Sequence, residues 1–336
     1  MTDTADATGR GEVVVTGADG FLGSNVVRAL LSSGYRARAV LEPGRETGTL
    51  TGLDVARARG SLLDPGFAAE VARGASGVVH TAASTAVWPS RIPSMRALNV
   101  DAALRLARAA KAAGVPVFVH VGSASSFEWG AKELPGDERG GYGSARFGLD
   151  YLDTKREAQE AMLALDSPGF RVVVVNPTFM FGPYDSRPSS GEMILALAAG
   201  KIPGYTAGGR SFADVRSVAS GVVAALGRGR GGQCYILGGV NLSYKEAFAA
   251  ISEAVGARPP GLRLPGFAAL AYGALGSSLS RLTGKPPKLS LAMTRVSLEG
   301  QYYDSSKAER ELGYAKGSLK EAVVAAAAWF RERGML

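Results

Sequence analysis

The sequence predicts a doubly wound α/β fold, in which helices cover both faces of a parallel sheet. In the first half of the chain, short runs of β-branched apolar residues alternate with longer helical patterns. Strands joined through helical crossovers run parallel. The runs are apolar throughout rather than alternating with polar residues, as expected for strands buried on both faces. After about residue 176 the pattern changes, and we expect a smaller, mostly helical lobe there.

The first half of the chain contains five strand-like runs and three helical patterns. A glycine cluster follows the first run, and Gly34 and Gly114 end two of the helical patterns. Glycine is common just after a helix because it adopts the left-handed backbone conformation easily. In chain order we expect a strand at 12–16, a helix at 22–33, strands at 36–41 and 78–80, a helix at 92–113, a strand at 115–121, a helix at 150–165 and a strand at 171–175.

The second half is loop-rich from 179 to 210 and then largely helical. We expect helices at 214–226, 244–255, 267–282, 307–312 and 319–333, and a short strand at 234–237. This pattern predicts a flexible tail (1–11), a sheet domain (12–176 and 213–240) and a substrate-binding lobe (177–212 and 241–336).

Composition narrows the class of protein. Of 336 residues, 46% are hydrophobic and 20% charged, which is typical of a globular chain rather than a disordered one. No apolar run is long enough to span a bilayer, and the polar start lacks a signal-peptide core. One cysteine, Cys234, allows no internal disulfide. We therefore expect a cytoplasmic protein.

Charge points to no macromolecular partner. The net charge is +8, but the surplus is spread along the chain without a basic stripe interleaved with aromatic residues, so we expect no nucleic-acid binding. Two histidines and one cysteine, scattered, offer no metal site. His80 and His120 are expected to be structural, and Cys234 buried and inert. The oligomeric state stays open, with a homodimer as one option.

The segment Thr16-Gly17-Ala18-Asp19-Gly20-Phe21-Leu22-Gly23 lies between the first strand and the first helix. Gly17 would permit the tight turn, Gly20 would let the backbone approach a pyrophosphate, and Gly23 would let the helix pack close to the sheet. Free N–H groups at the helix start would bind phosphate oxygens. This arrangement predicts dinucleotide binding in a Rossmann domain.

The second strand ends near Glu42, where such domains select the cofactor. A carboxylate there accepts hydrogen bonds from the adenosine ribose and repels a 2′-phosphate. Arg45 could instead bind that phosphate. NAD or NADP is therefore expected, with NAD favoured.

A tyrosine and a lysine, Tyr151 and Lys155, are four residues apart and share one face of a predicted helix. A nearby cation stabilises a phenolate and lowers the tyrosine pKa, which makes the phenol a better acid at neutral pH. Ser123 follows the strand at 115–121, where a doubly wound sheet places catalytic groups. Its hydroxyl could polarise a carbonyl, with Ser125 and Ser126 as rivals. Tyr142 is not a serious competitor, because the residue four positions later is an arginine.

These landmarks together resemble the extended short-chain dehydrogenase/reductase (NAD-dependent epimerase/dehydratase) superfamily. Within it, the chain is similar to dihydroflavonol 4-reductase-like proteins, including bacterial relatives called hopanoid-associated sugar epimerases. The similarity runs from about residue 12 to the C-terminus. The stretches that carry it are Val79-His80-Thr81-Ala82-Ala83, Asn99-Val100, Asn176-Pro177-Thr178, Phe181-Gly182-Pro183, Tyr235-Ile236-Leu237-Gly238-Gly239 and Tyr303-Asp304-Ser305-Ser306-Lys307-Ala308.

The resemblance implies a catalytic set of Ser123, Tyr151 and Lys155, with Asn99 holding a water or a backbone kink that supports the lysine. Three positions depart from the family pattern: Ser61 stands where an acidic residue often follows the glycine, Glu42 stands where NADPH-using relatives often have arginine, and Val121-Gly122 replaces common hydroxyl residues. The expected cofactor-binding residues are Gly17, Asp19, Gly20, Phe21, Leu22, Gly23, Glu42, Arg45, Ser61, Leu62, Thr81, Ala82, Ala83, Tyr151, Lys155, Pro177 and Thr178.

The function expected from these residues is hydride transfer between a nicotinamide and a carbonyl or secondary alcohol, with Tyr151 as general acid/base. Aromatic and apolar residues around the site favour an apolar or polycyclic small molecule. A nucleotide-sugar epimerase or dehydratase is the alternative, with Arg187, Arg210, Arg216 and Arg295 available to hold a diphosphate. A cofactor-sensing protein without catalysis is the second alternative. The expected pocket residues are Trp88, Ser125, Phe127, Phe179, Met180 and Tyr205.

Overall fold

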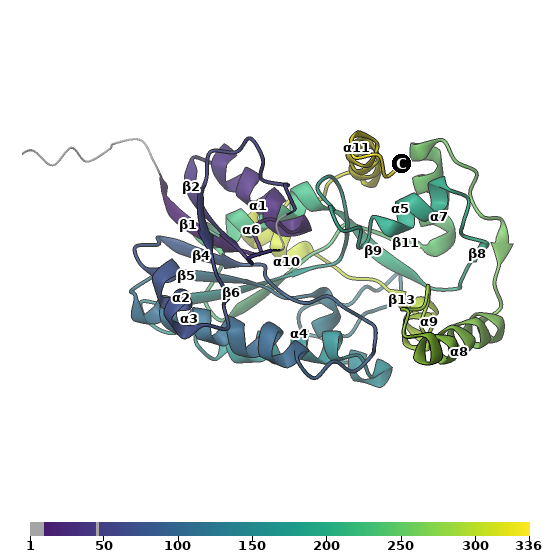
Figure 1. The fold of residues 1–336 in the computed structure, drawn as a ribbon, viewed down its shortest axis with the longest axis horizontal. Helices are drawn as coiled ribbons and strands as arrows, with labels where there is room; N and C mark the ends of the chain where they lie inside the picture. The colour runs from purple at the N-terminus through teal and green to yellow at the C-terminus, as the bar shows by residue number, and fades with distance from the viewer. Residues whose placement is uncertain (1–9, 45–46) are drawn as a thin grey trace, which may run out of the picture.

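The main layer of the structure is a seven-stranded, wholly parallel sheet (Figure 1). The computed structural model describes residues 10–44 and 47–336. The strands of this sheet are β1 (Arg10–Thr16), β2 (Tyr35–Leu41), β3 (Ala56–Arg59), β4 (Gly77–His80), β5 (Val117–Val121), β6 (Arg171–Pro177) and β10 (Gln233–Leu237).

The strand order is β10-β6-β5-β4-β1-β2-β3, so the direction of winding reverses between β1 and β4. Ligands of open α/β sheets bind at the carboxyl ends of the strands, beside such a reversal. The fold class expected from the sequence, a doubly wound Rossmann sheet, is confirmed. Strand β1 starts at Arg10, two residues before the predicted start, so residues 10 and 11 are not part of a tail. The rest of the predicted tail, residues 1–9, lies outside the described residues.

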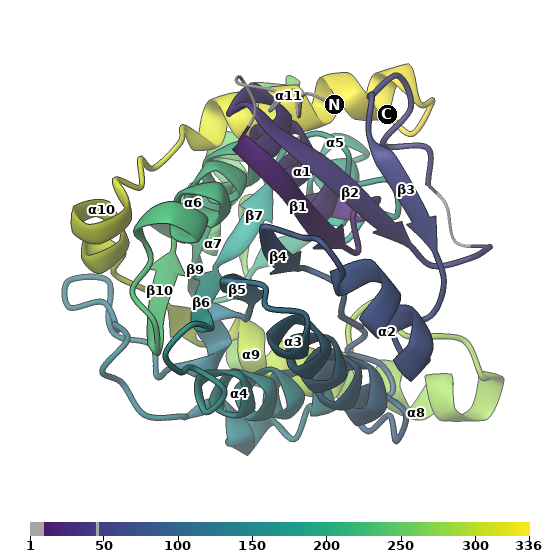
Figure 2. The ribbon, with the colours of Figure 1, turned by 90° about the vertical axis from the view of Figure 1, so that its left-hand side faces the viewer.

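Helices cover both faces of this sheet (Figure 2). Alternate residues of β1 enter two separate cores: Val13 and Val15 pack beneath one layer of helices, and Val14 beneath the other. This alternation explains why the strand is apolar along its whole length. The first layer is α1 (Phe21–Ser32), α6 (Val215–Arg228) and α10 (Ser306–Leu312), and the second is α2 (Pro65–Ala72), α3 (Ala102–Ala112) and α4 (Asp150–Leu163).

Two parts of this domain differ from the prediction. The expected helix at 92–113 contains a π-helical turn at Ala97–Asp101 before α3 begins. The pair β3 and α2 was not predicted, because the exposed edge strand β3 reads Ala-Arg-Ala-Arg and carries no apolar run.

The lobe contains a second sheet that the expectation of a mostly helical lobe did not include. This sheet is formed by β7 (Phe179–Phe181), β9 (Gly209–Asp214), β11 (Val240–Ser243) and β13 (Gly300–Gln301). A two-stranded sheet, β8 (Gly204–Tyr205) with β12 (Leu262–Arg263), lies apart from it. The helices of the lobe are α5 (Glu192–Ala198), α7 (Tyr244–Val255), α8 (Gly266–Thr283), α9 (Leu291–Ser297) and α11 (Leu319–Glu332).

The C-terminal segment is shared between the two parts. Helix α11 packs into the core of the lobe, where Phe330 belongs to the same cluster as Phe181 of β7 and Phe212 of β9. Ala308, Leu312 and Tyr314, in contrast, are buried in the core of the main sheet. The assignment of all of 241–336 to the lobe was therefore wrong for α10. A helix this short carries too few apolar residues for the sequence to indicate which core they enter.

Candidate active site

The glycine turn after β1 has the close backbone contacts that its sequence predicts. Gly17 has a φ of +63°, and a Cβ there would lie 2.8 Å from the Cα of Ala82. A Cβ on Gly23 would lie only 2.1 Å from the Gly17 carbonyl oxygen. At Gly20 the same oxygen, at 3.1 Å, is the only atom of the described residues that a Cβ would meet within 4 Å. The turn is thus tightly packed at its first and third glycines and open at its second.

This turn suits a dinucleotide. The N-cap residue of α1 is Gly20, which has no side chain to cap the helix, and the first turn carries no acidic residue, so its N–H groups and helix dipole remain available to a phosphate. Thr81, at the end of β4, donates a hydrogen bond of 2.6 Å to the Thr16 carbonyl and holds the neighbouring loop against the turn. The residues present therefore fit the pyrophosphate of a dinucleotide cofactor.

The other expected cofactor residues lie at the same edge of the sheet. Glu42 is exposed directly after β2, and Ser61 follows β3 by one glycine. Pro177 ends β6, and the Thr178 N–H donates to the carbonyl of Leu237. The Leu62 side chain is buried in the core, so only its backbone could reach a ligand. Arg45 lies outside the described residues.

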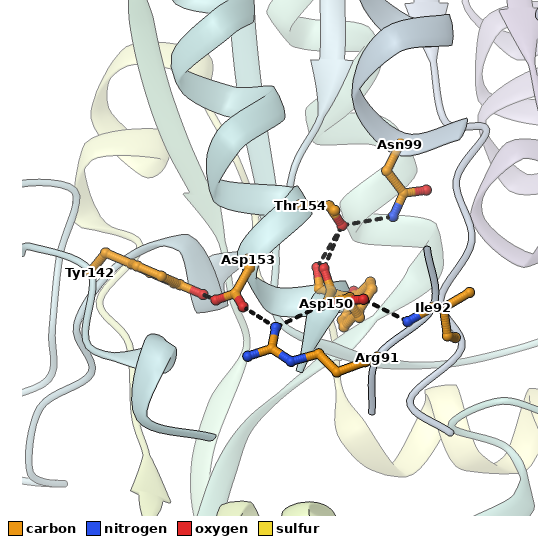
Figure 3. A network of polar contacts seen from close by, with 8 residues as sticks. Arg91, Ile92, Asn99, Tyr142, Asp150, Asp153 and Thr154 are labelled. Atoms are coloured by element: carbon orange, nitrogen blue, oxygen red, sulfur yellow. Dashed lines mark hydrogen bonds and ion pairs between the residues drawn. The ribbon is translucent and has the colours of Figure 1, made fainter. Parts of the chain in front are cut away.

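Helix α4 carries Tyr151 in its first turn and Lys155 one turn later. Its start is fixed by Asp150, whose carboxylate accepts hydrogen bonds of 2.6 Å from both Arg91 and the Ile92 N–H (Figure 3). Tyr142 donates to Asp153 on the outer side of the helix. Burial, followed by this hydrogen bond to a carboxylate, raises the Tyr142 pKa, and its phenolic proton is held by Asp153.

Tyr151 is partly buried, and the Ser123 side chain lies near it. Burial raises the pKa of the Tyr151 phenol, while a hydrogen bond with the Ser123 side chain and the charge of Arg210 oppose that rise. Arg210, the cation that favours the phenolate here, comes from the lobe. That the neighbouring Lys155 ammonium also lowers the tyrosine pKa stays a prediction.

Lys155 instead faces the end of the neighbouring strand. Its ammonium donates a hydrogen bond of 3.0 Å to the carbonyl of Val121, and burial lowers its pKa to about 8. At neutral pH this group still holds its proton, because the solution pH lies below its pKa. A charged donor is therefore held at the carboxyl end of β5, within the edge of the sheet where a cofactor would lie.

Asn99 connects the loop after β4 to the catalytic helix. Its carbonyl oxygen accepts from the Ser84 N–H at 2.7 Å, and its amide donates to the Ser84 carbonyl and to the Thr154 hydroxyl at 3.0 and 3.1 Å. The Thr154 hydroxyl in turn donates a hydrogen bond to the Asp150 carbonyl (Figure 3). Asn99 sits in the π-helical turn, a feature often found at functional sites. It braces α4 through Thr154, next to Lys155, rather than through the lysine itself.

Ser123 has extended backbone and lies two residues after β5, at the start of a short 3₁₀ turn. Its hydroxyl lies 2.7 Å from that of its predicted rival Ser125, so these two form one pair, while the other rival, Ser126, is fully buried. A Cβ at Gly122 would lie 2.6 Å from the side-chain nitrogen of Asn176. That nitrogen donates to the Ser123 carbonyl. The departure at Val121-Gly122 thus makes room for an amide that supports Ser123.

The sequence did not indicate that Arg210 lies near the catalytic residues. It lies in β9, donates 2.9 Å to the Tyr244 hydroxyl, and its guanidinium is centred 5.0 Å from the Phe179 ring. In the part of the chain that the structure describes, it forms no ion pair with a carboxylate. Arg216, another candidate for holding a diphosphate, is paired with Asp214. Only the pairing of β9 within the lobe could have revealed that the charge of Arg210 acts on the Tyr151 phenol.

The expected pocket residues separate into two groups. Phe127 is 3% exposed and belongs to the core under α3 and α4, so its assignment to the pocket was wrong. Phe179 and Tyr205 pack partly against the lobe core, and Met180 against the main core. Trp88, Ser125, Phe179, Met180 and Tyr205 all keep partly exposed surface.

The two histidines lie side by side beneath the site. His80 and His120 are paired on β4 and β5, with ring centroids 5.5 Å apart. Burial lowers the pKa of His80 to about 3, and the Lys155 charge adds to this. Burial likewise lowers the His120 pKa well below its usual value. Burial raises the pKa of the Cys234 thiol to about 12. All three groups are therefore neutral at pH 7.

Comparison with known proteins identifies the family of this chain. Residues 13–238 match the model of the NAD dependent epimerase/dehydratase family. The chain is 31% identical to sterol demethylase protein B of Methylococcus capsulatus, covering 96% of this chain and 99% of that protein. It is 30% identical to the 4-hydroxy-2-methyl-3-oxo-4-farnesyl-3,4-dihydroquinoline-1-oxide ketoreductase of Stigmatella aurantiaca, with coverage of 90% and 91%.

A solved structure is also similar along its whole length. The nucleoside-diphosphate-sugar epimerase of Pseudomonas aeruginosa superimposes with a TM-score of 0.78 at 27% identity, covering 97% of this chain and 99% of that one. The chain belongs to the NAD dependent epimerase/dehydratase family and is an NAD(P)-dependent oxidoreductase of the extended short-chain dehydrogenase/reductase type.

Proposed function

We propose that this enzyme is a ketoreductase or hydroxy-dehydrogenase that acts on an apolar or polycyclic small molecule, with Tyr151 as its general acid/base. The observation that carries the proposal is the Tyr151 phenol at the start of α4, where the Ser123 side chain and the charge of Arg210 both favour its phenolate form. Two neighbouring hydroxyls can hold and polarise a carbonyl oxygen. Transfer of the phenolic proton then completes the reduction.

A bound nicotinamide cofactor would supply the hydride for the carbonyl carbon, and the chain's own residues would act on the carbonyl oxygen. Ser123 donates a hydrogen bond to that oxygen, and Tyr151 gives up its proton as negative charge develops there. Arg210 stabilises the resulting phenolate until it takes a proton from water. The Lys155 ammonium, held by Val121, would bind the ribose of the cofactor. In the oxidative direction, the same proton returns to Tyr151.

Two observations support an apolar substrate. Phe179, Met180 and Tyr205 keep partly exposed apolar surface in the lobe segment that follows β6. The two relatives named above carry the names of enzymes of sterol and farnesyl-quinoline chemistry, whose molecules combine rings with apolar chains. We assign NAD as the preferred cofactor because Glu42 follows β2, where a carboxylate suits a free ribose hydroxyl.

Arg210 favours one alternative, a nucleotide-sugar epimerase or dehydratase. A guanidinium without a carboxylate partner in the described structure could hold an anionic group of the substrate. The similarity to a nucleoside-diphosphate-sugar epimerase points the same way. In that reaction the hydride is removed and returned, so the cofactor shows no net change.

Replacement of Tyr151 by Phe tests the proposal. The variant removes only the phenolic oxygen, so the turnover of cyclic and polycyclic ketones should fall about 10²- to 10⁴-fold. Its affinity for NADH, measured by calorimetry, should stay within about twofold of the wild type, because the ring still packs. Tyr142→Phe is the matched control and should keep near-normal turnover.

A panel of ketones and UDP-sugars separates the alternatives. Consumption of NADH with ketones, followed at its absorbance band, supports the reductase. Interconversion of UDP-sugars without net change in the cofactor would make the epimerase the correct assignment. Tight NAD binding without turnover of either class would indicate a cofactor-sensing protein. Near-normal ketone turnover by Tyr151→Phe would refute the role of the phenol.

A further inference from the structure

Helix α8 turns its large apolar side chains outward. Phe267, Leu275 and Leu282 are 78%, 71% and 85% exposed, and Tyr272 and Leu279 are also exposed. Their spacing of three to five residues places them on one side of the helix. The helix lies at the end of the molecule away from β1 and β2 (Figure 1). The solvent-facing side of a helix normally carries polar residues, so this apolar stripe indicates an interaction surface.

The opposite side of α8 is built from small residues. Ala269, Gly273, Ser277 and Ser280 are buried there. A Cβ on Gly273 would lie 2.3 Å from the Thr294 hydroxyl of α9, and the Ser277 hydroxyl accepts a hydrogen bond of 2.9 Å from the Leu291 N–H. Close packing and hydrogen bonds hold this face on α9. The side of α8 that packs on the rest of this chain is therefore the side with the small residues. The exposed stripe is not part of the protein core.

The charge around α8 has a single sign. Residues 254–298 contain no Asp or Glu. The basic residues in this segment are all exposed, and none forms an ion pair within the described part of the chain. They are Arg258, Arg263, Arg281, Lys285, Lys288 and Arg295.

We propose that α8 docks the enzyme on the surface of a bilayer that contains anionic lipids. An apolar stripe flanked by basic residues is the combination that binds at the boundary between headgroups and acyl chains. The leucines and Phe267 would enter the acyl region, while the arginines and lysines would contact lipid phosphates. Among residues 10–44 and 47–336, no helix is long and apolar enough to cross a membrane, so the contact is with the surface.

The docking face is connected to the active site through α9. Val296 of α9 packs with Phe147, Leu149 and Leu152 at the start of the catalytic helix, and Met293 and Tyr151 border the same cluster. A bilayer under α8 would therefore lie close to the site where an apolar ketone must enter. The inference that the substrate enters from the bilayer rests on the proposed function, whereas the inference that α8 docks on the bilayer does not.

Vesicle flotation with the full chain, without substrate or cofactor, tests the docking. The protein should float with vesicles of phosphatidylcholine containing about a third phosphatidylglycerol, and bind them at least about tenfold more strongly than phosphatidylcholine alone. High salt should weaken this binding, since it screens the basic residues. The double variant Leu275→Ser, Leu279→Ser should lose at least about tenfold in binding.

Leu134→Ser is the matched control, because Leu134 is 79% exposed but lies outside α8. It should bind vesicles like the wild type, and all variants should keep the wild-type melting temperature. Absence of binding to the anionic vesicles, or equal loss in both variants, would overturn the proposal. So would a concentration-dependent dimer in gel filtration that the double variant abolishes, because the stripe would then join two copies. Binding is measured without turnover, so failure of the ketoreductase assignment would leave this result unaffected.

Discussion

Asn99 donates a hydrogen bond of 3.1 Å to the Thr154 hydroxyl and thereby ties the loop after β4 to the helix that carries Tyr151 and Lys155. Both side chains are buried. Because a buried amide that loses its partners costs about 1–3 kcal/mol, this link should be strong. It joins the segment expected near the nicotinamide to the residue expected to move the proton.

We predict that Asn99→Ala lowers kcat more than Thr154→Val, and that the two effects are not additive. A double-mutant cycle on log kcat should give a coupling of at least about 0.5 kcal/mol, as found for residues in one hydrogen-bond network. Arg96→Ala is the control, because its exposed ion pair with Glu157 also links this helix turn to α4. That variant should change kcat by less than about twofold. Additive effects of Asn99→Ala and Thr154→Val would show that Asn99 acts only on overall stability.

The glycines of the turn after β1 should respond differently to the same substitution. Gly23→Ala forces a methyl against the Gly17 carbonyl and should destabilise the fold by about 1–3 kcal/mol. Gly20→Ala meets only one atom, at 3.1 Å, so the fold should lose little. Its methyl would occupy the space through which a pyrophosphate approaches, and NAD affinity should fall at least about tenfold.

Urea unfolding without cofactor and calorimetric titration with NAD measure these two effects separately. Gly227→Ala is the control, since a Cβ there meets nothing within 4 Å. It should leave NAD affinity unchanged and stabilise α6 slightly. If Gly20→Ala binds NAD as well as the wild type, the pyrophosphate does not lie on this turn.

How much of this site could be predicted from the sequence depended on where the residues lie in the chain. The glycine turn, Ser123 and Tyr151 with Lys155 each follow an element whose apolar pattern is plain, so topology places them at one edge of the sheet. Arg210 was a candidate for binding a diphosphate, but its effect on Tyr151 depends on the packing of β9. That strand belongs to a small sheet whose four strands come from distant segments of the chain.

The spacing of residues along the sequence could not predict which groups interact with the charged side chains of the site. A lysine four residues after a tyrosine shares its helix face, yet the Lys155 ammonium is directed to the Val121 carbonyl. Likewise Phe127, next to a catalytic segment, packs into the core because the 3₁₀ turn after Ser123 directs it inward. Sequence indicates which residues are near the site, but the direction of each side chain is set by tertiary packing.

Glu42 should control the choice between NADH and NADPH. Its carboxylate is exposed at the end of β2, where it would lie close to a 2′-phosphate and repel it. Glu42→Gln should raise kcat/KM for NADPH relative to NADH by about tenfold, because the interaction between two partly solvated charges is on the order of 1 kcal/mol. Glu70→Gln, on α2, changes the net charge equally and should leave the ratio unchanged. A ratio unaffected by Glu42→Gln would place the adenosine ribose elsewhere.

The stacked histidines should make the fold sensitive to acid. Both imidazoles have a lowered pKa in the folded protein, about 3 for His80, against about 6.5 in an unfolded chain. The unfolded state therefore binds protons that the folded state does not. The stability that these groups contribute is complete above pH 6.5 and is lost as the pH falls toward 3. Each histidine can lower the free energy of unfolding by up to about 1.4 kcal/mol per pH unit in that range.

His120→Phe should remove one of the two histidine protons that the unfolded chain binds in acid, while keeping an aromatic ring beside His80. Neither nitrogen of His120 has a hydrogen-bond partner in the described structure, whereas His80 is bonded to Thr16 at 2.7 Å. The variant should match or exceed the wild type in stability at pH 7.5, because it buries no unpaired polar atom. Its advantage should widen as the pH falls from 6.5 to 4, in urea unfolding at a series of pH values. The chain has no other histidine, so an unchanged pH slope in His120→Phe would mean that the acid sensitivity arises from carboxylates.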